Sequence, residues 1–509
     1  MTKPAPLFGG GDWSFETLSR TYDAIEDIAL NDLGLDVYPN QIEIISFEQM
    51  IDAYSSLGMP LMYQHWSFGK HFAQEERRYR KGFAGLAYEI AINSNPCISY
   101  NLDENSMAMQ TLVMAHAAFG HNHFYKNNYL FRQWSDAEGI LDYLQHSSGY
   151  IAKCEDLYGP IAVEEVLDSA HALTDHAIFR YRRPLELTSK QENEREQRRA
   201  KHESEDFRDI WLTLPQDKGK KKESNPAKDE VERKRALKLP QENLLYFIAE
   251  HSPVLEHWQR SVLHIIHDTA QYFYPQRQTK VMNEGCATFV HHYIVNALFE
   301  KGLLSEGAML EILLSHTNVI FQPDFDHPRY SGINPYALGF GMMKDIQRMC
   351  VTPTREDYDW FPDLAGTADW RSVLKDAWSN YRDESFVRQY LSPRMIRKMK
   401  LFEIVDDASD EHLTVAAIHD ERGYRKVRGA LAESYDPSCA DPDIQIVDVS
   451  LKVDRVLHLE HRMRKGIPLA EDARDEVLKH IRRLWGYDVR FVGVDGESGK
   501  ELYESSTVE

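Results

Sequence analysis

The sequence predicts a mainly α-helical protein, in which a large helical domain with a charged insertion precedes a smaller α+β domain. Over most of residues 1–400, long segments carry apolar residues three and four positions apart, as amphipathic helices do. One internal segment is crowded with charged residues, and the apolar segments become short near the carboxyl end. We therefore divide the chain into a first helical half (1–184), a charged linker or insertion (185–240), a second helical half (241–400) and an α+β domain (401–509).

The first helical half begins with an amphipathic helix at residues 15–30. Leu18, Tyr22 and Ile25 recur three and four apart there, and Gly34 marks the end of the segment. A helix at 75–92 stops before Pro96, because the residue preceding a proline is pushed out of helical geometry. The same pattern predicts further helices at 105–120, 135–158 and 163–177.

The charged insertion contains the strings KQENEREQ from Lys190 and KGKKK from Lys218. Residues 217–229 hold too few apolar side chains to bury a helix face. This composition indicates a solvated surface segment rather than a nucleic-acid patch.

Helical periodicity returns at 241–301, 305–314 and 338–349. Beyond residue 400, short apolar segments at 401–405, 412–419, 444–449 and 489–494 predict strands, and 469–485 predicts one strong helix. An α+β domain of about 100 residues has an ordinary domain size.

Charge and composition exclude several classes of protein. Acidic residues outnumber basic ones 80 to 59, and the net charge of −21 disfavours nucleic acid and anionic membranes as partners. No segment reaches the roughly 18 to 20 apolar residues of a membrane-spanning helix, and Pro and Gly interrupt the amino-terminal segment that an export signal would need. The five cysteines are scattered and form no CxxC pair, which fits reduced thiols and gives a zinc finger no support. We expect a soluble, cytoplasmic protein without a membrane span.

The string MAHAAFGHNHF from Met114 places His116, His121 and His123 at the end of an apolar helix. A turn at Gly120 would let these imidazoles converge on a transition metal. In a continuous α-helix, however, His116 and His121 are five positions apart and point to different faces, whereas His116 and His123 are two turns apart. Each of the three histidines is equally well explained as a hydrogen-bonded core residue.

A second cluster, MNEGCATFVHH from Met282, contains Glu284 and His291. Their spacing of seven returns them to one face of a helix after two turns, and Gly285 and Ala287 would let another helix or a ligand approach closely. A carboxylate in such apolar surroundings needs a metal, a base or a hydrogen-bond donor. A backbone or tyrosine donor would satisfy Glu284 equally well, and Glu89 raises the same question more weakly.

Several strings in a shared order resemble the SpoVR (stage V sporulation protein R) family, over nearly the whole chain. The resemblance implies a role linked to the cell envelope or the spore cortex, or, in bacteria that make no spores, to a stress response and a serine protein kinase. It carries over no catalytic residue. The matching strings are HWSFGK from His65, LAYEI from Leu86, NSNPCI from Asn93, residues 116–124 followed by KNN, YFYPQRQTK from Tyr272 and NEG from Asn283.

Two interpretations of function remain open. In the first, the protein is a metal-dependent hydrolase in which His116, His121 and His291 bind a divalent ion, zinc or another transition metal. Glu284 is then a fourth ligand or the base that activates water, and His123 is a reserve ligand or supports the ligands. This interpretation requires that two segments about 160 residues apart meet in the fold. In the second, the protein is a non-catalytic regulator or scaffold that binds a partner protein, and its oligomeric state is left open.

Overall fold

A computed structural model describes residues 5–55, 59, 62–66, 70, 89–180, 234–235, 237–402, 404–405, 409, 411–412, 414–415, 420–449, 454–464 and 467–506. The chain forms two compact units, each built from two distant stretches of sequence. The first unit combines Met1–Asp168 with Ser261–Pro442, and the second combines Ser169–Arg260 with Asp443–Glu509. The predicted domain boundaries at residues 184, 240 and 400 stay predictions, and most of the charged insertion lies outside the described residues.

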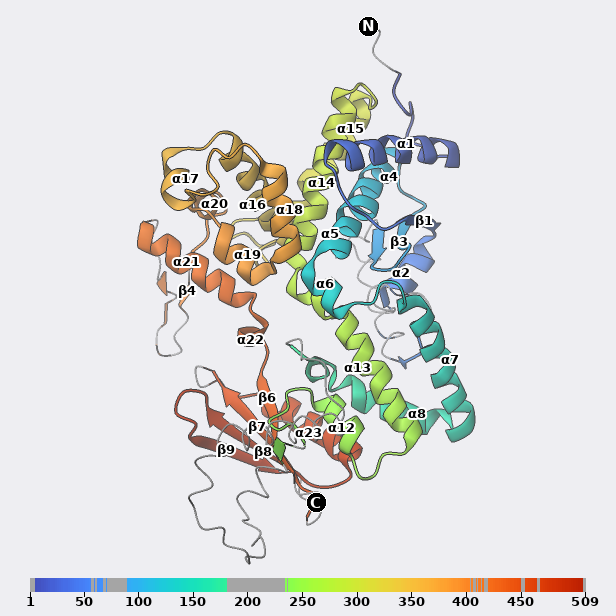
Figure 1. The fold of residues 1–509 in the computed structure, drawn as a ribbon, viewed down its shortest axis with the longest axis vertical. Helices are drawn as coiled ribbons and strands as arrows, with labels where there is room; N and C mark the ends of the chain where they lie inside the picture. Colours follow the sequence, from blue (N-terminus) through green and yellow to red (C-terminus); the bar gives the residue numbers. More distant parts are fainter. Residues whose placement is uncertain are drawn as a thin grey trace, which may run out of the picture. The chain divides into compact units, whose positions relative to one another are not determined.

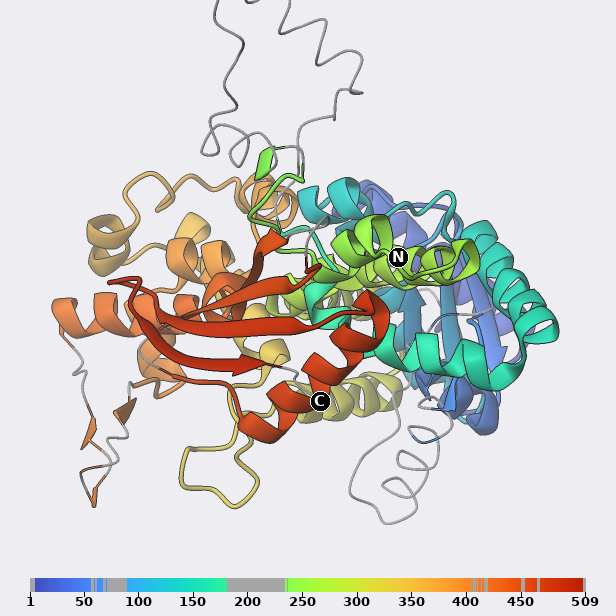
Figure 2. The ribbon, with the colours of Figure 1, turned by 90° about the horizontal axis from the view of Figure 1, so that it is seen from below.

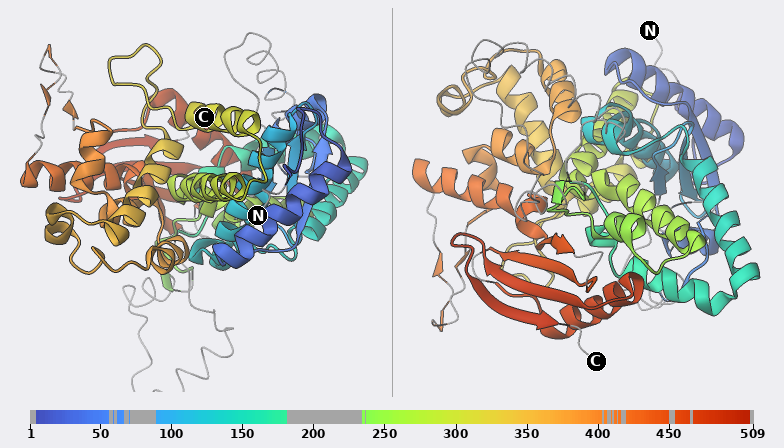
Figure 3. Two further views of the ribbon diagram at one scale, coloured as in Figure 1. Left: turned by 90° about the horizontal axis from the view of Figure 1, so that it is seen from above. Right: turned by 60° about the horizontal axis from the view of Figure 1, so that its bottom comes forward.

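Helix α14 (Lys280–Glu300) is the centre of the first unit. Its side chains are buried on nearly every side, as expected of a helix surrounded by protein. Figures 1 and 3 show α14 (yellow-green) between the blue amino-terminal elements and the orange helices α16 to α19. Phe119, Phe289 and Trp378 belong to one large core that includes residues from both sides.

The amino-terminal side of this core consists of helices interrupted by two π-helical segments. In chain order these elements are α1 (Phe15–Asp27), η1 (Ile28–Asp32), α2 (Phe47–Ser55), α4 (Met107–Val113), η2 (Met114–His121), α5 (Asn122–Asn127), α6 (Tyr129–Trp134), α7 (Ile140–Tyr158) and α8 (Pro160–His171), which reaches into the second unit.

The carboxyl-terminal side is formed by α13 (His257–Gln278), which also begins in the second unit, α15 (Glu306–Val319), α16 (Pro335–Val351), α17 (Arg355–Trp360), α18 (Trp370–Asn380), α19 (Asp383–Tyr390), α20 (Pro393–Lys398), α21 (Glu421–Ser434) and α22 (Pro437–Ala440). The short strands β4 (Ile404–Val405) and β5 (Thr414–Val415) pair antiparallel.

A small sheet inside the helical unit was not predicted. Strand β3 (Cys97–Leu102) lies between β1 (Asn40–Ile45), which is parallel to it, and β2 (Glu89–Ile92), which is antiparallel. The prediction of a helix at 75–92 is therefore wrong for residues 89–92, and its earlier residues lie outside the described part of the chain. The physical reason is long-range: Ile90 and Ile92 pair with Tyr100 and Ile98 of β3, which no local helical pattern contains.

The second unit contains a four-stranded sheet of order β6 (Asp443–Val449), β7 (Leu457–Met463), β8 (Val489–Asp495) and β9 (Glu501–Ser506). The strands β7 and β8 are parallel, and α23 (Glu471–Trp485) supplies the crossover between them, as Figure 2 shows. The unit also contains α12 (Leu244–His251) and the 3₁₀ turn η3 (Thr174–His176).

The predicted fold class, mainly α with an α+β carboxyl-terminal region, is confirmed. The strands predicted at 444–449 and 489–494 and the helix at 469–485 are present, whereas β7 and β9 were missed. Within the described residues, every helix is too short or too polar to cross a bilayer.

Candidate metal centre

The π-helical segment η2 brings two of the predicted histidines onto one face. Residues 105–120 were predicted as one α-helix, but the chain changes from α4 to η2 at Met114. In a π-helix the hydrogen bonds run from residue i to i+5, so residues five apart lie close to one another. The rings of His116 and His121 accordingly have centroids 4.7 Å apart. The spacing that argued against convergence in an α-helix therefore favours it in this segment.

Small residues allow η2 and α16 to approach α14 from two sides. A Cβ atom on Gly120 would lie 2.5 Å from Cα of Ala287, and one on Gly285 would lie 2.6 Å from Cα of Gly339. These distances are shorter than any allowed carbon contact, so glycine is required at both crossings. The close approach that Gly285 and Ala287 predicted is present, and it places Glu284 beside η2.

Three side chains turn their ligand atoms toward one point. The Oε2 atom of Glu284 lies 3.8 Å from Nε2 of His116 and 3.6 Å from Nε2 of His121. The three ligand atoms are all within 4.8 Å of one another. Two ligands about 2.0–2.2 Å from a tetrahedral zinc ion are about 3.3–3.6 Å apart, so the two separations between Glu284 and the imidazoles are close to those of a zinc site. Oε2 of Glu284 is buried, and no described residue lies at hydrogen-bonding distance and angle from this atom. Tyr336, a donor of the kind that the sequence left open, interacts with the same carboxyl group and helps to lower its pKa, after the larger effects of His116 and His121.

Both histidines are held from behind through their other ring nitrogen. Nδ1 of His121 lies 2.9 Å from Oδ1 of Asn283, an acceptor, so His121 donates there and its Nε2 carries the lone pair. Nδ1 of His116 lies 2.9 Å from Nδ1 of His291, whose Nε2 lies 2.9 Å from Nδ1 of His316. When Nδ1 of His116 donates to His291, and Nε2 of His291 donates to His316, Nε2 of His116 carries a lone pair. Such supporting bonds are typical of histidines that bind metals.

His291 is therefore not one of the three converging side chains. It forms a hydrogen bond with His116 on the side away from them. Glu284 and His291 do share one face of α14, as their spacing predicted, and both approach His116. Burial, followed by the neighbouring imidazoles of His116 and His316, lowers the pKa of His291 well below its usual range. A neutral His291 fits the role of a hydrogen-bonding support.

His123 lies elsewhere in the core. Its Nδ1 is 2.9 Å from the carbonyl oxygen of Asp36, and its ring packs edge-on against Trp378. The change from the π-helical η2 to the α-helical α5 alters the turn angle between His116 and His123, so the two-turn spacing of a regular helix does not apply. Asn283 and His316 were missed as supporting residues, and the only sequence signal for Asn283 was its place in the string NEG.

Glu89 is a fourth group at the centre, reached through the unpredicted sheet. Strand β2 places Oε1 of Glu89 3.6 Å from Nε2 of His116. Burial is the main reason that the pKa of Glu89 is raised, and the neighbouring Glu284 raises it further against the lowering effect of His116. Two carboxyl groups thus share one buried site, where a cation would relieve their repulsion.

The charge states of the other groups follow from burial and their neighbours. Burial disfavours the charged form of Glu284, but the imidazoles of His116 and His121 outweigh it and lower its pKa. Burial also disfavours the charged form of His116, yet Glu284 and Glu89 raise its pKa overall. Burial lowers the pKa of His121 to about 4. One ionised carboxylate and one neutral imidazole with a free lone pair are suitable ligands for a transition metal.

The centre lies in the wall of a cavity of about 1120 Å³. The imidazoles, Glu284 and Glu89 line one part of it, and apolar side chains such as Phe273 and Phe321 line another. A ligand-binding site of this kind combines apolar walls with a few converging polar groups. A molecule in the cavity could therefore reach the ligand atoms directly.

Comparisons with known proteins agree over nearly the whole chain. The family described as "SpoVR like protein" matches residues 12–439, and the "SpoVR-like C-terminal domain" matches residues 442–496. A protein of Escherichia coli (strain K12), described as "Uncharacterized protein YcgB", is 49% identical over 498 residues, which cover 98% of this chain and 96% of the relative. No solved structure matches significantly. The resemblance carried by strings such as HWSFGK and NEG is thereby confirmed, and the chain belongs to the SpoVR family.

Proposed function

We propose that this protein is a metal-dependent hydrolase whose divalent ion is held by His116, His121 and Glu284. One observation carries the proposal: two supported imidazole nitrogens and a buried carboxylate oxygen without a hydrogen-bond donor face one another in the wall of a cavity. Two histidines with one glutamate form a common catalytic zinc site, which leaves a coordination position open. A divalent ion in such a site polarises the bond to be cleaved and activates water.

Glu89 is the residue that we assign as the general base. Glu284 is placed as a ligand because its Oε2 atom faces both imidazoles, whereas Glu89 approaches only His116. A base with a raised pKa accepts a proton more readily near neutral pH than an ordinary glutamate. The sequence left two roles open for Glu284, metal ligand or general base. We propose that Glu284 is the ligand and that Glu89 is the base.

Metal content measured by mass spectrometry on untagged protein, purified without added metal, tests the proposal. We expect about one ion per chain in the wild type and close to none in His116→Ala and Glu284→Gln. The matched control is His123→Gln, which changes a buried histidine two positions beyond His121 and should keep its ion. Addition of the ion at about 100 times its dissociation constant should stabilise the metal-free wild type by about 2.7 kcal/mol and leave Glu284→Gln unchanged.

The identity of the ion separates two kinds of chemistry. Zinc would support hydrolysis, whereas iron in a site of two histidines and one carboxylate is typical of oxygen-dependent enzymes. A well-folded wild type without any ion would overturn the proposal and favour the scaffold interpretation, in which a partner protein is bound. The physiological setting that the family resemblance implied, in the spore cortex, the cell envelope or a stress response with a serine protein kinase, stays a prediction.

A further inference from the structure

The cavity beside the metal centre has an uneven distribution of charge. Among the described residues that line it, the acidic groups are Glu89 and Glu284, both at the centre itself. Away from the centre, the charged lining residues are Lys280 and Arg329, and both are exposed. Within the described residues, neither of these two cations forms an ion pair with a carboxylate. Two cations without a carboxylate partner in the wall of one cavity favour a ligand of opposite charge, in a protein whose net charge is −21.

Lys280 has a defined position relative to the metal centre. It is the first residue of α14 and precedes Glu284 by four residues, so the two side chains lie on the same face of the helix, one turn apart. One turn corresponds to about 5–6 Å along the helix axis. An anionic group bound by Lys280 would therefore sit beside the ion-binding atoms and not on them.

Arg329 belongs to a connection between α15 and α16 that is tied together at its base. The amide Nδ2 of Asn334 donates to the carbonyl oxygen of Val319 at 2.8 Å, and the backbone N–H of Asn334 donates to Oε1 of Gln322 at 2.7 Å. The backbone N–H of Arg329 donates to Nδ1 of His327 at 3.1 Å. The two bonds of Asn334 tie the ends of the connection together, and Arg329 is one of the residues that line the cavity.

We infer that the substrate carries an anionic group, a phosphate or a carboxylate, which Lys280 and Arg329 bind while the bond to be cleaved lies at the metal centre. The inference rests on the proposed function, because it assigns the cavity to that reaction. Arg329 offers a planar set of donors that matches two oxygens of such a group, and Lys280 adds a point charge. The apolar wall with Phe273 and Phe321 would accommodate an uncharged part of the same molecule.

The test is calorimetric titration of metal-stripped full-length protein with phenylphosphonate, benzoate and neutral benzamide. Without the ion, the anions have only the protein's own cations to bind, so the result does not depend on metal chemistry. We expect either anion to bind at least about tenfold more tightly than benzamide, and Lys280→Ala and Arg329→Ala each to weaken this binding by roughly tenfold. A preference for phenylphosphonate indicates a phosphate group, and a preference for benzoate indicates a carboxylate.

The control is Lys153→Ala, an exposed lysine of α7 that does not line the cavity, and its anion affinity should equal that of the wild type. The inference would be overturned if the wild type bound the anions and benzamide with equal affinity, or bound no anion at millimolar concentration. It would also be overturned if both variants bound the anions as tightly as the wild type. Metal content is measured on the same preparations, and both variants should keep the ion. Absence of metal from the wild type would refute the proposed function separately, even where the anions bind as expected.

Discussion

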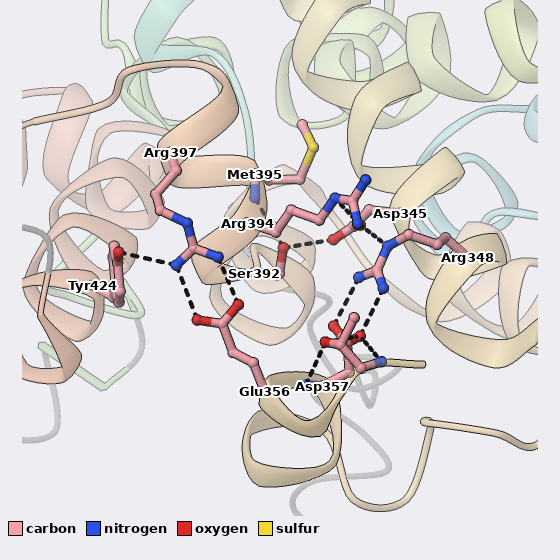
Figure 4. Close-up of polar contacts among 10 residues, drawn as sticks. Asp345, Arg348, Glu356, Asp357, Ser392, Arg394, Met395, Arg397 and Tyr424 are labelled. Atoms are coloured by element: carbon pink, nitrogen blue, oxygen red, sulfur yellow. Dashed lines mark hydrogen bonds and ion pairs between the residues drawn. The ribbon is translucent and has the colours of Figure 1, made fainter. Parts of the chain in front are cut away.

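Two groups of charged side chains lie inside the helical unit, and they differ in how their charges are satisfied. In the first, the guanidinium of Arg348 forms paired hydrogen bonds of 2.6 and 2.7 Å with Asp357 and a third of 2.8 Å with Asp345 (Figure 4). Asp357 also accepts from Thr354, and Asp345 accepts from Ser392. This group joins α16, α17 and α20 and is closed, since each charge has a partner of opposite sign.

The candidate metal centre is open by the same criterion. Glu284 and Glu89 are largely buried beside His116, and neither an arginine nor a lysine pairs with them among the described residues. An unpaired buried carboxylate destabilises a fold unless another group compensates for it. The difference teaches that the charges of the Arg348 group are satisfied by the protein alone, whereas the Glu284 group has the features expected of a site that takes up a cation.

The largest effect that we expect distinguishes these two groups by stability. Arg348→Ala would leave Asp357 and Asp345 buried without their main partner and should lower the free energy of unfolding by about 3–5 kcal/mol. Denaturant unfolding measures this loss. Arg397→Ala, in the same region, removes a more exposed pair with Glu356 and should cost at most about 1 kcal/mol. Equal losses in the two variants would show that the Arg348 group is not a structural centre.

Removing the charge of Glu89 should have the opposite sign in metal-free protein. We expect Glu89→Gln to leave the stability of the metal-free chain unchanged or to raise it, because burial and the neighbouring Glu284 disfavour the ionised form of Glu89. A large loss of unfolding free energy in this variant would place Glu89 in the same structural class as Asp357.

The next effect concerns the helix crossing that assembles the centre. Gly120→Ala forces a Cβ atom against the backbone of Ala287, and we expect a loss of about 1–3 kcal/mol in stability together with a loss of bound metal. The matched control is Gly149→Ala in α7, where a Cβ atom meets nothing within 4 Å. That change should stabilise the protein by about 0.5–1 kcal/mol, because alanine favours the helix. If Gly120→Ala retained the ion, the close crossing of η2 and α14 would not be needed for metal binding.

A smaller effect is expected from the support behind His121. Asn283→Ala removes the acceptor for Nδ1 of this histidine and should weaken metal binding by about tenfold, with little change in folding. Competition with a chelator of known affinity measures the change. Asn296→Ala is the control, since this asparagine of α14 bonds the backbone of its own helix at His292. An unaltered affinity in Asn283→Ala would mean that the bond does not orient the ligand.

The smallest effect is the pH dependence of the closed group. Burial alone would raise the pKa of Asp357, but the hydrogen bonds from Arg348 and Thr354 lower it from 3.8 to about 2. The stability that its ionised form contributes is therefore fully present above about pH 4 and is lost as the pH falls through 2. We expect the difference in unfolding free energy between wild type and Asp357→Asn to be constant near neutral pH and to narrow between pH 4 and 2. A difference that is independent of pH in this range would contradict the assignment.

Much of the fold and part of the site could be predicted from local patterns. Helical periodicity located helices such as α1, α7, α14 and α16, but not α17 to α22. The apolar setting of His116, His121 and Glu284 marked these residues as candidates, because a buried polar side chain in an apolar helix needs a partner. The spacing of Glu284 and His291 also placed them correctly on one face. The Arg348 group was missed, since its partners come from helices that are adjacent only after folding.

The sequence by itself determined which residue types are available: two histidines near a small-residue crossing, a glutamate in an apolar helix, and a family that covers the chain. Tertiary structure alone decided how they are arranged. The π-helical turn at Met114 placed His116 beside His121 and sent His123 toward Asp36, and the pairing of β2 with β3 brought Glu89 to the centre. The strand pairing joins segments that the local pattern does not connect, and such packing outweighs the small intrinsic preference of any residue for helix or strand.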